Sequence, residues 1–93
     1  KVSLKLVGAG FKGRSMDIMH ETYPPGADTG AEMLQHDGEE GGVVISGEIE
    51  LTVGLEVYQL KAGDGYYFSS SRPHRFRNTG TEPCEIISAN PPG

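Results

Sequence analysis

The chain has 93 residues and a mass of 10.0 kDa, which is room for one domain with a modest hydrophobic core. No apolar run has the length of a membrane-spanning helix and no signal-peptide pattern is present, so we expect no membrane partner. The single cysteine, Cys84, excludes an intrachain disulfide framework and a cysteine-based zinc site. A lone thiol is consistent with the reduced cytoplasm, where we expect the protein to work.

The net charge is −5 and the isoelectric point is near 5.0, which is the wrong sign for a surface that holds the phosphate backbone of DNA. Between positions 15 and 60 the chain carries ten acidic residues and no lysine or arginine. Three arginines then follow close together, at Arg72, Arg75 and Arg77. Either these are solvated faces of opposite sign, or the arginines lie near a pocket mouth and orient an anionic ligand. We expect no direct contact between this chain and nucleic acid.

Short β-strands are predicted along the whole chain, because windows free of glycine and proline are few and none has a helical apolar period. The clearest signal is strict alternation over residues 48–53, with Ile49, Leu51 and Val53 facing inward. About eight short strands, spaced roughly ten residues apart, predict an all-β antiparallel sandwich or barrel. The expected strands cover residues 14–23, 31–35, 42–46, 48–53, 55–60, 66–68, 74–78 and 84–89.

Three side chains are candidates for metal binding. His36 and Glu40 are four residues apart, so on an extended strand both would point to one face. His74 begins a later strand and shares its inward face with Phe76 and Asn78. Two imidazoles and one carboxylate suit borderline divalent metals and leave coordination positions open for water or substrate. The spacing alone is weak evidence, because such a trio also occurs by chance in many chains.

Glycines and polar residues around this trio fall into two spaced sets that resemble the two sequence motifs of the cupin superfamily. The first set is His36, Glu40 and Gly47, and the second is Gly63, His74 and Asn78. The resemblance spans about residues 24–90 and implies a single cupin jelly-roll barrel, also called a double-stranded β-helix. It implies that His36, Glu40 and His74 are the metal ligands. Leu34 stands where the first motif of the family has another histidine.

The leucine at position 34 leaves three interpretations open. The remaining His36, Glu40 and His74 could hold a divalent metal such as Zn, Ni, Fe or Mn with more coordination positions open, unless Gln35, Asp37 or His20 replaces the missing ligand. Alternatively, the pocket is free of metal and binds an organic molecule through hydrogen bonds. In the third interpretation the two histidines are hydrogen-bonded core residues without a ligand.

A narrower resemblance concerns residues 23–30, 33–40 and 73–78, which are similar to the C-terminal cupin of XRE-type helix-turn-helix transcriptional regulators. It implies that residues 1–93 are one cupin domain, the C-terminal effector-sensing fragment of a longer regulator. In that family DNA is bound by a separate N-terminal domain, the cupin binds a small metabolite, and the protein is a homodimer. We therefore expect a sensor domain without a catalytic function.

The residues expected to line the effector pocket combine the polar trio with neighbouring side chains on the inward faces of the later strands. They are His36, Glu40, Tyr66, Arg72, His74 and Phe76. The acidic run would suit a cationic ligand such as an amine, whereas the arginines would suit an acid, so the sign of the ligand is open. A small metal-dependent cupin enzyme, of the dioxygenase or isomerase type, is the alternative function.

Overall fold

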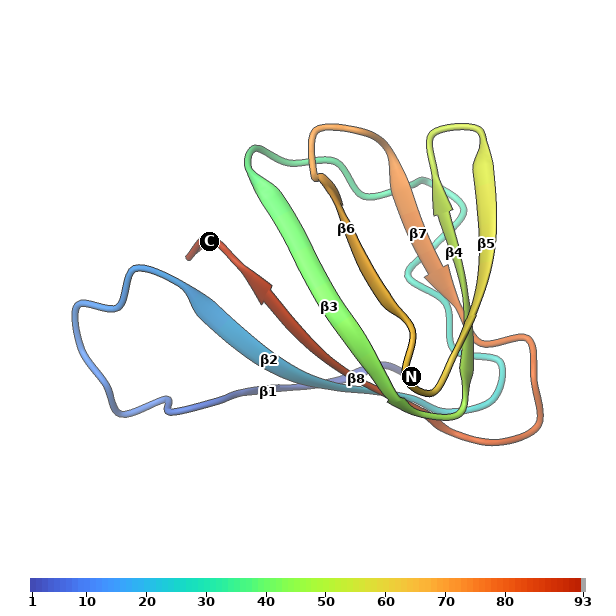
Figure 1. The fold of residues 1–93 in the computed structure, drawn as a ribbon, viewed down its shortest axis with the longest axis horizontal. Helices are drawn as coiled ribbons and strands as arrows, with labels where there is room; N and C mark the ends of the chain where they lie inside the picture. The colour runs from blue at the N-terminus through green and yellow to red at the C-terminus, as the bar shows by residue number, and fades with distance from the viewer. Residues whose placement is uncertain (93) are drawn as a thin grey trace.

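The computed structural model describes residues 1–92 and contains two antiparallel β-sheets that face each other (Figure 1). The larger sheet has the strand order β1-β2-β8-β3-β6, and the smaller has the order β5-β4-β7. The strands are β1 (Ser3–Leu6), β2 (Asp17–Tyr23), β3 (Glu39–Ser46), β4 (Glu48–Val53), β5 (Glu56–Lys61), β6 (Gly65–Ser69), β7 (His74–Arg77) and β8 (Cys84–Asn90). The predicted all-β class with about eight strands is confirmed. Within residues 1–92 there is no helix long and apolar enough to cross a membrane.

The core lies between the two sheets and is built by alternating side chains. Along β4, Ile49, Leu51 and Val53 are buried, as the sequence pattern predicted. They meet Phe76 of the neighbouring strand β7 and Ile86 of β8 in the opposite sheet within one hydrophobic cluster. Burying such side chains contributes about 1.5–3 kcal/mol each, so this cluster provides much of the free energy of folding. Cys84 is also fully buried and belongs to the same hydrophobic cluster.

Two strand predictions were wrong at the level of whole elements. Residues 31–35 form no strand, because only Leu34 makes an isolated bridge, to His74. In contrast, β1 forms a strand that the pattern did not indicate, since all four of its side chains are exposed. It pairs antiparallel with β2 at the sheet edge, and that pairing makes it a strand. The strand predicted to begin at Arg14 begins instead at Asp17.

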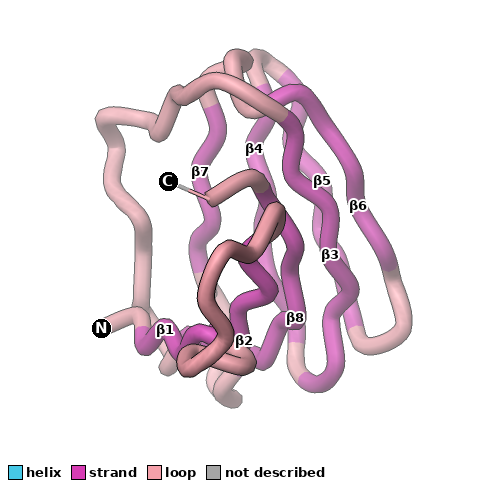
Figure 2. Tube along the Cα trace, turned by 90° about the vertical axis from the view of Figure 1, so that its left-hand side faces the viewer, coloured by secondary structure: helices cyan, strands magenta, loops and turns pink. Residues whose placement is uncertain are grey.

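The long connection between β2 and β3 runs along the open edge of β7 from one end of the barrel to the other (Figure 2). Two isolated bridges, Asp28 to Arg77 and Leu34 to His74, attach it to this strand. The Thr29 amide donates to the Phe76 carbonyl at 3.0 Å, and the Thr29 hydroxyl accepts from the Phe76 amide at the same distance. The connection therefore closes the side of the barrel where β7 has no neighbouring strand.

Candidate functional site

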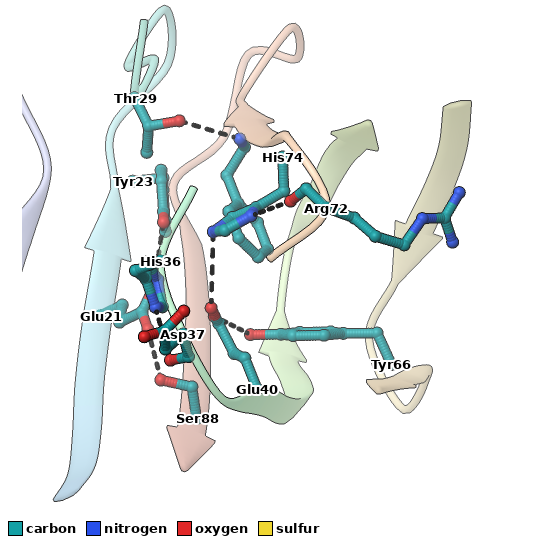
Figure 3. A network of polar contacts seen from close by, with 11 residues as sticks. Glu21, Tyr23, Thr29, His36, Asp37, Glu40, Tyr66, Arg72, His74 and Ser88 are labelled. Atoms are coloured by element: carbon teal, nitrogen blue, oxygen red, sulfur yellow. Dashed lines mark hydrogen bonds and ion pairs between the residues drawn. The ribbon is translucent and has the colours of Figure 1, made fainter. Parts of the chain in front are cut away.

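His36, Glu40 and His74 come together at one end of the barrel, as the sequence predicted (Figure 3). Each contributes one potential ligand atom, and these three atoms lie within 4.8 Å of one another. Glu40 is near the start of β3 and His74 is the first residue of β7, so the two sheets each supply one member. The imidazole centroids of His36 and His74 are 5.2 Å apart and the rings are nearly perpendicular.

His36 reaches this cluster from a loop, whereas the sequence predicted an extended chain from His36 to Glu40 that would point both side chains to one face. Strand β3 begins only at Glu39, after a bend at Gly38, so strand alternation does not control the direction of His36. Its position depends on backbone hydrogen bonds to the β6–β7 loop. The His36 amide donates to the Ser70 carbonyl at 2.9 Å, and the Ser70 amide donates to the Gly38 carbonyl at 2.9 Å. His36 is exposed, while the other two members are buried.

The His74 side chain has one free nitrogen lone pair. Its Nδ1 donates to the Arg72 carbonyl at 2.8 Å, which assigns the proton to Nδ1 and leaves Nε2 as an acceptor. Nε2 is buried without a hydrogen-bond partner, because its contact to Glu40 Oε1 is 3.9 Å long. Burial, together with the nearby His36, lowers the pKa of His74, so the ring is neutral at pH 7. A buried free acceptor of this kind is uncommon and indicates a ligand position.

Glu40 is only 8% exposed, and within residues 1–92 it forms no ion pair with a lysine or arginine, since its one basic neighbour is the His74 ring at 3.9 Å. The Tyr66 hydroxyl donates to Oε2 at the long distance of 3.5 Å. Burial, and then the negative charge of Glu21, raise the pKa of Glu40 to about 7. The pKa of Tyr66 is itself raised by burial and by these two acids, so its hydroxyl stays protonated as a donor.

Glu21 is a second buried carboxylate on the same inner surface, and the sequence analysis did not identify it. The Tyr23 hydroxyl donates to Oε1 at 2.9 Å and the Ser88 hydroxyl donates to Oε2 (Figure 3). His20, the preceding residue of β2, points to the opposite face of the sheet. There its Nε2 lies 2.8 Å from Glu85 Oε1. The signal that could have indicated Glu21 was its spacing from Tyr23, because residues two apart on a strand point to the same face.

A cavity of about 740 Å³, here called the acidic cavity, opens beside Glu21 and Glu40. Glu21 and Glu40 line its inner part, and Asp17 and Asp28 lie at its rim. The rim carboxylates are paired with arginines, Asp17 with Arg14 at 3.7 Å and Asp28 with Arg75 at 2.5 Å. The inner carboxylates contact hydroxyl groups and have no lysine or arginine partner in the described part of the chain. Lys1 is the one basic residue among those that line this cavity, against four acidic ones, so the lining carries an excess of acidic groups.

The family model described as the Cupin domain matches residues 19–90. The chain belongs to the cupin family. Over 91 residues this cupin is 46% identical to the HTH-type transcriptional regulator PuuR of Escherichia coli K12, covering 98% of the chain and 49% of that regulator. It thus spans about half the length of this curated relative.

Two further comparisons connect the cupin to different kinds of protein. The crystal structure of the Cupin_2 domain of an XRE-family transcriptional regulator from Enterobacter cloacae superposes with a TM-score of 0.83 and 26% identity, covering 99% of this chain and 97% of that one. The alginate biosynthesis protein AlgA of Pseudomonas putida KT2440 is 35% identical over 75 residues, which cover 81% of this chain and 15% of that protein. The predicted cupin resemblance is confirmed, including its likeness to regulator cupins.

Of the other residues predicted for the ligand site, Phe76 and Tyr66 lie at the cavity or the polar trio, and Arg72 does not. Phe76 lines the acidic cavity, and Tyr66 contacts Glu40 through its hydroxyl. The Arg72 side chain extends away from the polar trio, and only its backbone carbonyl contacts His74 (Figure 3). Arg77 pairs with Glu50 on the smaller sheet at 2.8 Å. The arginine cluster therefore does not supply a free cation to the cavity.

The donor set of this cupin fits a divalent metal. The hydrogen bond from His74 Nδ1 to a backbone carbonyl orients the ring as in metal-binding histidines, and the orphaned Nε2 lone pair faces the other two donors. Leu34 lies at the rim of the acidic cavity and cannot add a ligand. Of the suggested replacements, Gln35 donates to the Ser71 carbonyl at 2.8 Å, His20 pairs with Glu85, and Asp37 is not among the residues whose donor atoms lie within 4.8 Å of one another. His36, Glu40 and His74 are thus the set that would hold the ion.

Proposed function

We propose that this cupin is the effector-sensing domain of a cytoplasmic helix-turn-helix transcriptional regulator, and that its effector is a small molecule with an ammonium group. The similarity to PuuR and to the Enterobacter cloacae domain supports the regulator role. The charge of the cavity supports the choice of ligand. The same proposal holds that residues 1–93 are the C-terminal part of that regulator.

The observation that carries the ligand class is the pair of buried carboxylates, Glu21 and Glu40, which have no lysine or arginine partner among residues 1–92. A buried charge normally has a counter-charge, because removing it from water costs several kcal/mol. An ammonium group between Glu40 and His74 Nε2 would supply that counter-charge and would donate to the orphaned acceptor. Phe76 and Leu34 would contact the apolar part of the ligand.

The direct test of this class is isothermal titration calorimetry with linear alkyl amines, the matched alcohols and the matched carboxylates. We expect the amines to bind, and the variants Glu40→Gln and Glu21→Gln to weaken binding about tenfold or more, since a hydrogen bond to a charged group contributes roughly 1.5–3 kcal/mol. Glu32→Gln, on the exposed connection before β3, is the matched control. Preferential binding of the carboxylates would contradict the proposal.

In the full-length regulator, the effector would act by binding two arrangements of the protein with different affinities. The DNA-binding domain is a separate part of the polypeptide in this proposal, and the cupin makes no contact with the operator. A change in operator affinity on adding the amine, lost in Glu40→Gln, would support this coupling. An amine that binds the cupin without changing operator affinity would refute the sensing role but leave the ligand site intact.

We also propose that the domain is a homodimer. Val43, Ile45 and Tyr67 are exposed on the outer surface of the larger sheet, which suits contact with a second copy. Multi-angle light scattering tests this, with Val43→Glu as the variant that should give a monomer. A wild-type chain that is monomeric at all concentrations would contradict it.

A metal centre at His36, Glu40 and His74 is the second candidate, favoured by the three donor atoms within 4.8 Å and by the free Nε2 of His74. A bound divalent ion would act as a Lewis acid, and the similarity to AlgA, a biosynthesis protein, is compatible with an enzyme of the isomerase or dioxygenase type. Metal analysis after incubation with Zn²⁺, Mn²⁺, Ni²⁺ or Fe²⁺ tests this candidate. Stoichiometric binding that is lost in His74→Ala would support it, and no retained metal would exclude it.

A further inference from the structure

A second cavity, of about 220 Å³, opens on the side of the barrel between β5 and β6. These strands are the edges of the two different sheets and do not pair with each other. The cavity walls are aliphatic and aromatic, formed by Leu51, Val53, Tyr58, Leu60, Tyr66 and Phe68. An engineered protein cavity of about 150 Å³ is known to bind benzene, so the space suits a molecule that contains one ring or a short alkyl chain.

The charge at this lateral cavity is opposite to that of the acidic cavity. Arg72 is one of its lining residues, and none of the lining residues is acidic. Among residues 1–92, Arg14, Arg75 and Arg77 form ion pairs with carboxylates, whereas Arg72 forms none. The Arg72 guanidinium lies over the β4–β5 turn, close to Gly54, and remains exposed. The cavity thus joins an apolar interior to one unpaired cation.

The nearby acidic residue Glu56 does not neutralise this cation. Glu56 Oε1 accepts a hydrogen bond from the Tyr58 hydroxyl at 2.7 Å, and the pair is exposed. On the other side, the Tyr66 hydroxyl is directed to Glu40. The two tyrosines therefore present their rings to the lateral cavity while their hydroxyl groups are hydrogen-bonded elsewhere, which keeps the cavity walls apolar.

We propose that the lateral cavity is a second binding site, for a small aryl or short-chain alkyl carboxylate. The apolar part of the ligand would lie between Leu60 and Phe68, and its carboxylate would accept hydrogen bonds from the Arg72 guanidinium, whose planar fork matches a carboxylate. This site is distinct from the acidic cavity, which favours the opposite charge. Tyr66 belongs to the wall of the lateral cavity and contacts Glu40, so it separates the two sites.

The experiment is a ¹H–¹⁵N NMR titration with three molecules that share one ring and differ in charge: phenylacetate, 2-phenylethanol and 2-phenylethylammonium. We expect phenylacetate to shift the amide signals of Leu60, Gly65 and Arg72 and to bind more tightly there than the other two. Arg72→Gln should weaken phenylacetate about tenfold, because a charge-assisted hydrogen bond contributes roughly 1.5–3 kcal/mol. Arg77→Gln, which removes a paired arginine on the smaller sheet, is the matched control and should leave this affinity unchanged.

A second variant tests the cavity without changing its charge. Leu60→Phe adds volume at the partly buried wall and should block phenylacetate while Arg72 remains. Equal affinity for the alcohol, unchanged affinity in Arg72→Gln, or shifts confined to Glu40 and His74 would each overturn the proposal. Failure here is distinct from failure of the effector site, because Glu40→Gln should abolish the ammonium response and leave the phenylacetate response at the lateral cavity.

Discussion

Glu40 is a buried carboxyl group whose pKa in the folded protein is raised to about 7, mainly by burial and then by Glu21. Because this value lies above that of an unfolded glutamate, the folded state binds more protons between about pH 4.5 and pH 7. The contribution of Glu40 to stability is therefore most favourable below pH 4.5 and is lost as the pH rises through 7. In the metal-free protein, Glu40→Gln should remove this slope and stabilise the fold by about 3 kcal/mol at pH 8.

Urea unfolding curves measured between pH 5 and pH 8 in the presence of a chelator test this prediction. The range avoids the acid region in which Asp28 titrates, since the hydrogen bond from Arg75 lowers the pKa of that carboxyl to about 2. Glu32→Gln is the control for loss of one exposed acid. A Glu40→Gln protein with the same pH slope as the wild type would mean that Glu40 is not the group responsible.

At the scale of single residues, the polar trio could be predicted from the sequence, whereas the second buried carboxylate, Glu21, could not. The spacing of His36, Glu40 and His74 became informative together with Gly47, Gly63 and Asn78, because these positions resemble the cupin motifs, and the structure brings the three donors together. Glu21 was missed because its position inside depends on which face of β2 meets the core, and β2 has weak apolar alternation. Arg72 was assigned to the ligand site from its sequence proximity to His74, but it lies in the bend before β7 begins, so strand alternation does not control the direction of its side chain.

At the scale of elements, the turn between β3 and β4 depends on Gly47, whose φ angle is +77°. A Cβ atom there would lie 2.3 Å from the Pro83 carbonyl oxygen and 2.9 Å from Cys84 Cα. Gly47→Ala should destabilise the fold by about 3 kcal/mol, because the cost of the strained backbone is added to the cost of steric overlap with Pro83 and Cys84 at the start of β8. Gly63 also has a positive φ angle, +93°, but a Cβ there meets nothing within 4 Å.

The glycine pair is a matched comparison. Gly63→Ala should lower the free energy of unfolding by about 1 kcal/mol, which is the cost of the positive φ angle without steric overlap. Thermal or urea unfolding of the two variants gives the difference, which is the steric contribution at Gly47. Equal destabilisation of both variants would show that the close approach of the β3–β4 turn to Pro83 is not needed for the fold.

Strands with one buried face were predicted correctly from the sequence, whereas segments whose conformation depends on pairing with a neighbouring strand were not. Alternation over β4 is strict, so its bounds and its inward face were predicted correctly. The four residues of β1 carry no burial pattern and become a strand by pairing with β2. Residues 31–35 have an extended bridge at Leu34 only, because this segment is held by β7 on one side and bends before His36. Such edges are determined by tertiary contacts and are invisible in a local pattern.

At the scale of the whole molecule, acidic residues outnumber basic ones and three of the four arginines are already paired. Arg14, Arg75 and Arg77 are each paired with a carboxylate, and the net charge is −5. Phosphate groups of DNA would have to displace these carboxylates to contact Arg14, Arg75 or Arg77, which leaves Arg72 as the one arginine without an ion pair among residues 1–92. The barrel therefore has inner surfaces suited to small charged molecules and an outer surface poorly suited to a polyanion.

We expect the isolated 93-residue chain to show no saturable binding to duplex DNA, measured by fluorescence anisotropy at low ionic strength, where nonspecific electrostatic binding is strongest. The reason is the net charge together with the pairing of three of the four arginines. A double variant, Asp28→Asn with Glu50→Gln, frees Arg75 and Arg77 and reduces the negative charge by two, so it should show weak, salt-sensitive binding. Saturable binding by the wild-type chain would contradict the division of roles, in which the cupin senses and another domain contacts DNA.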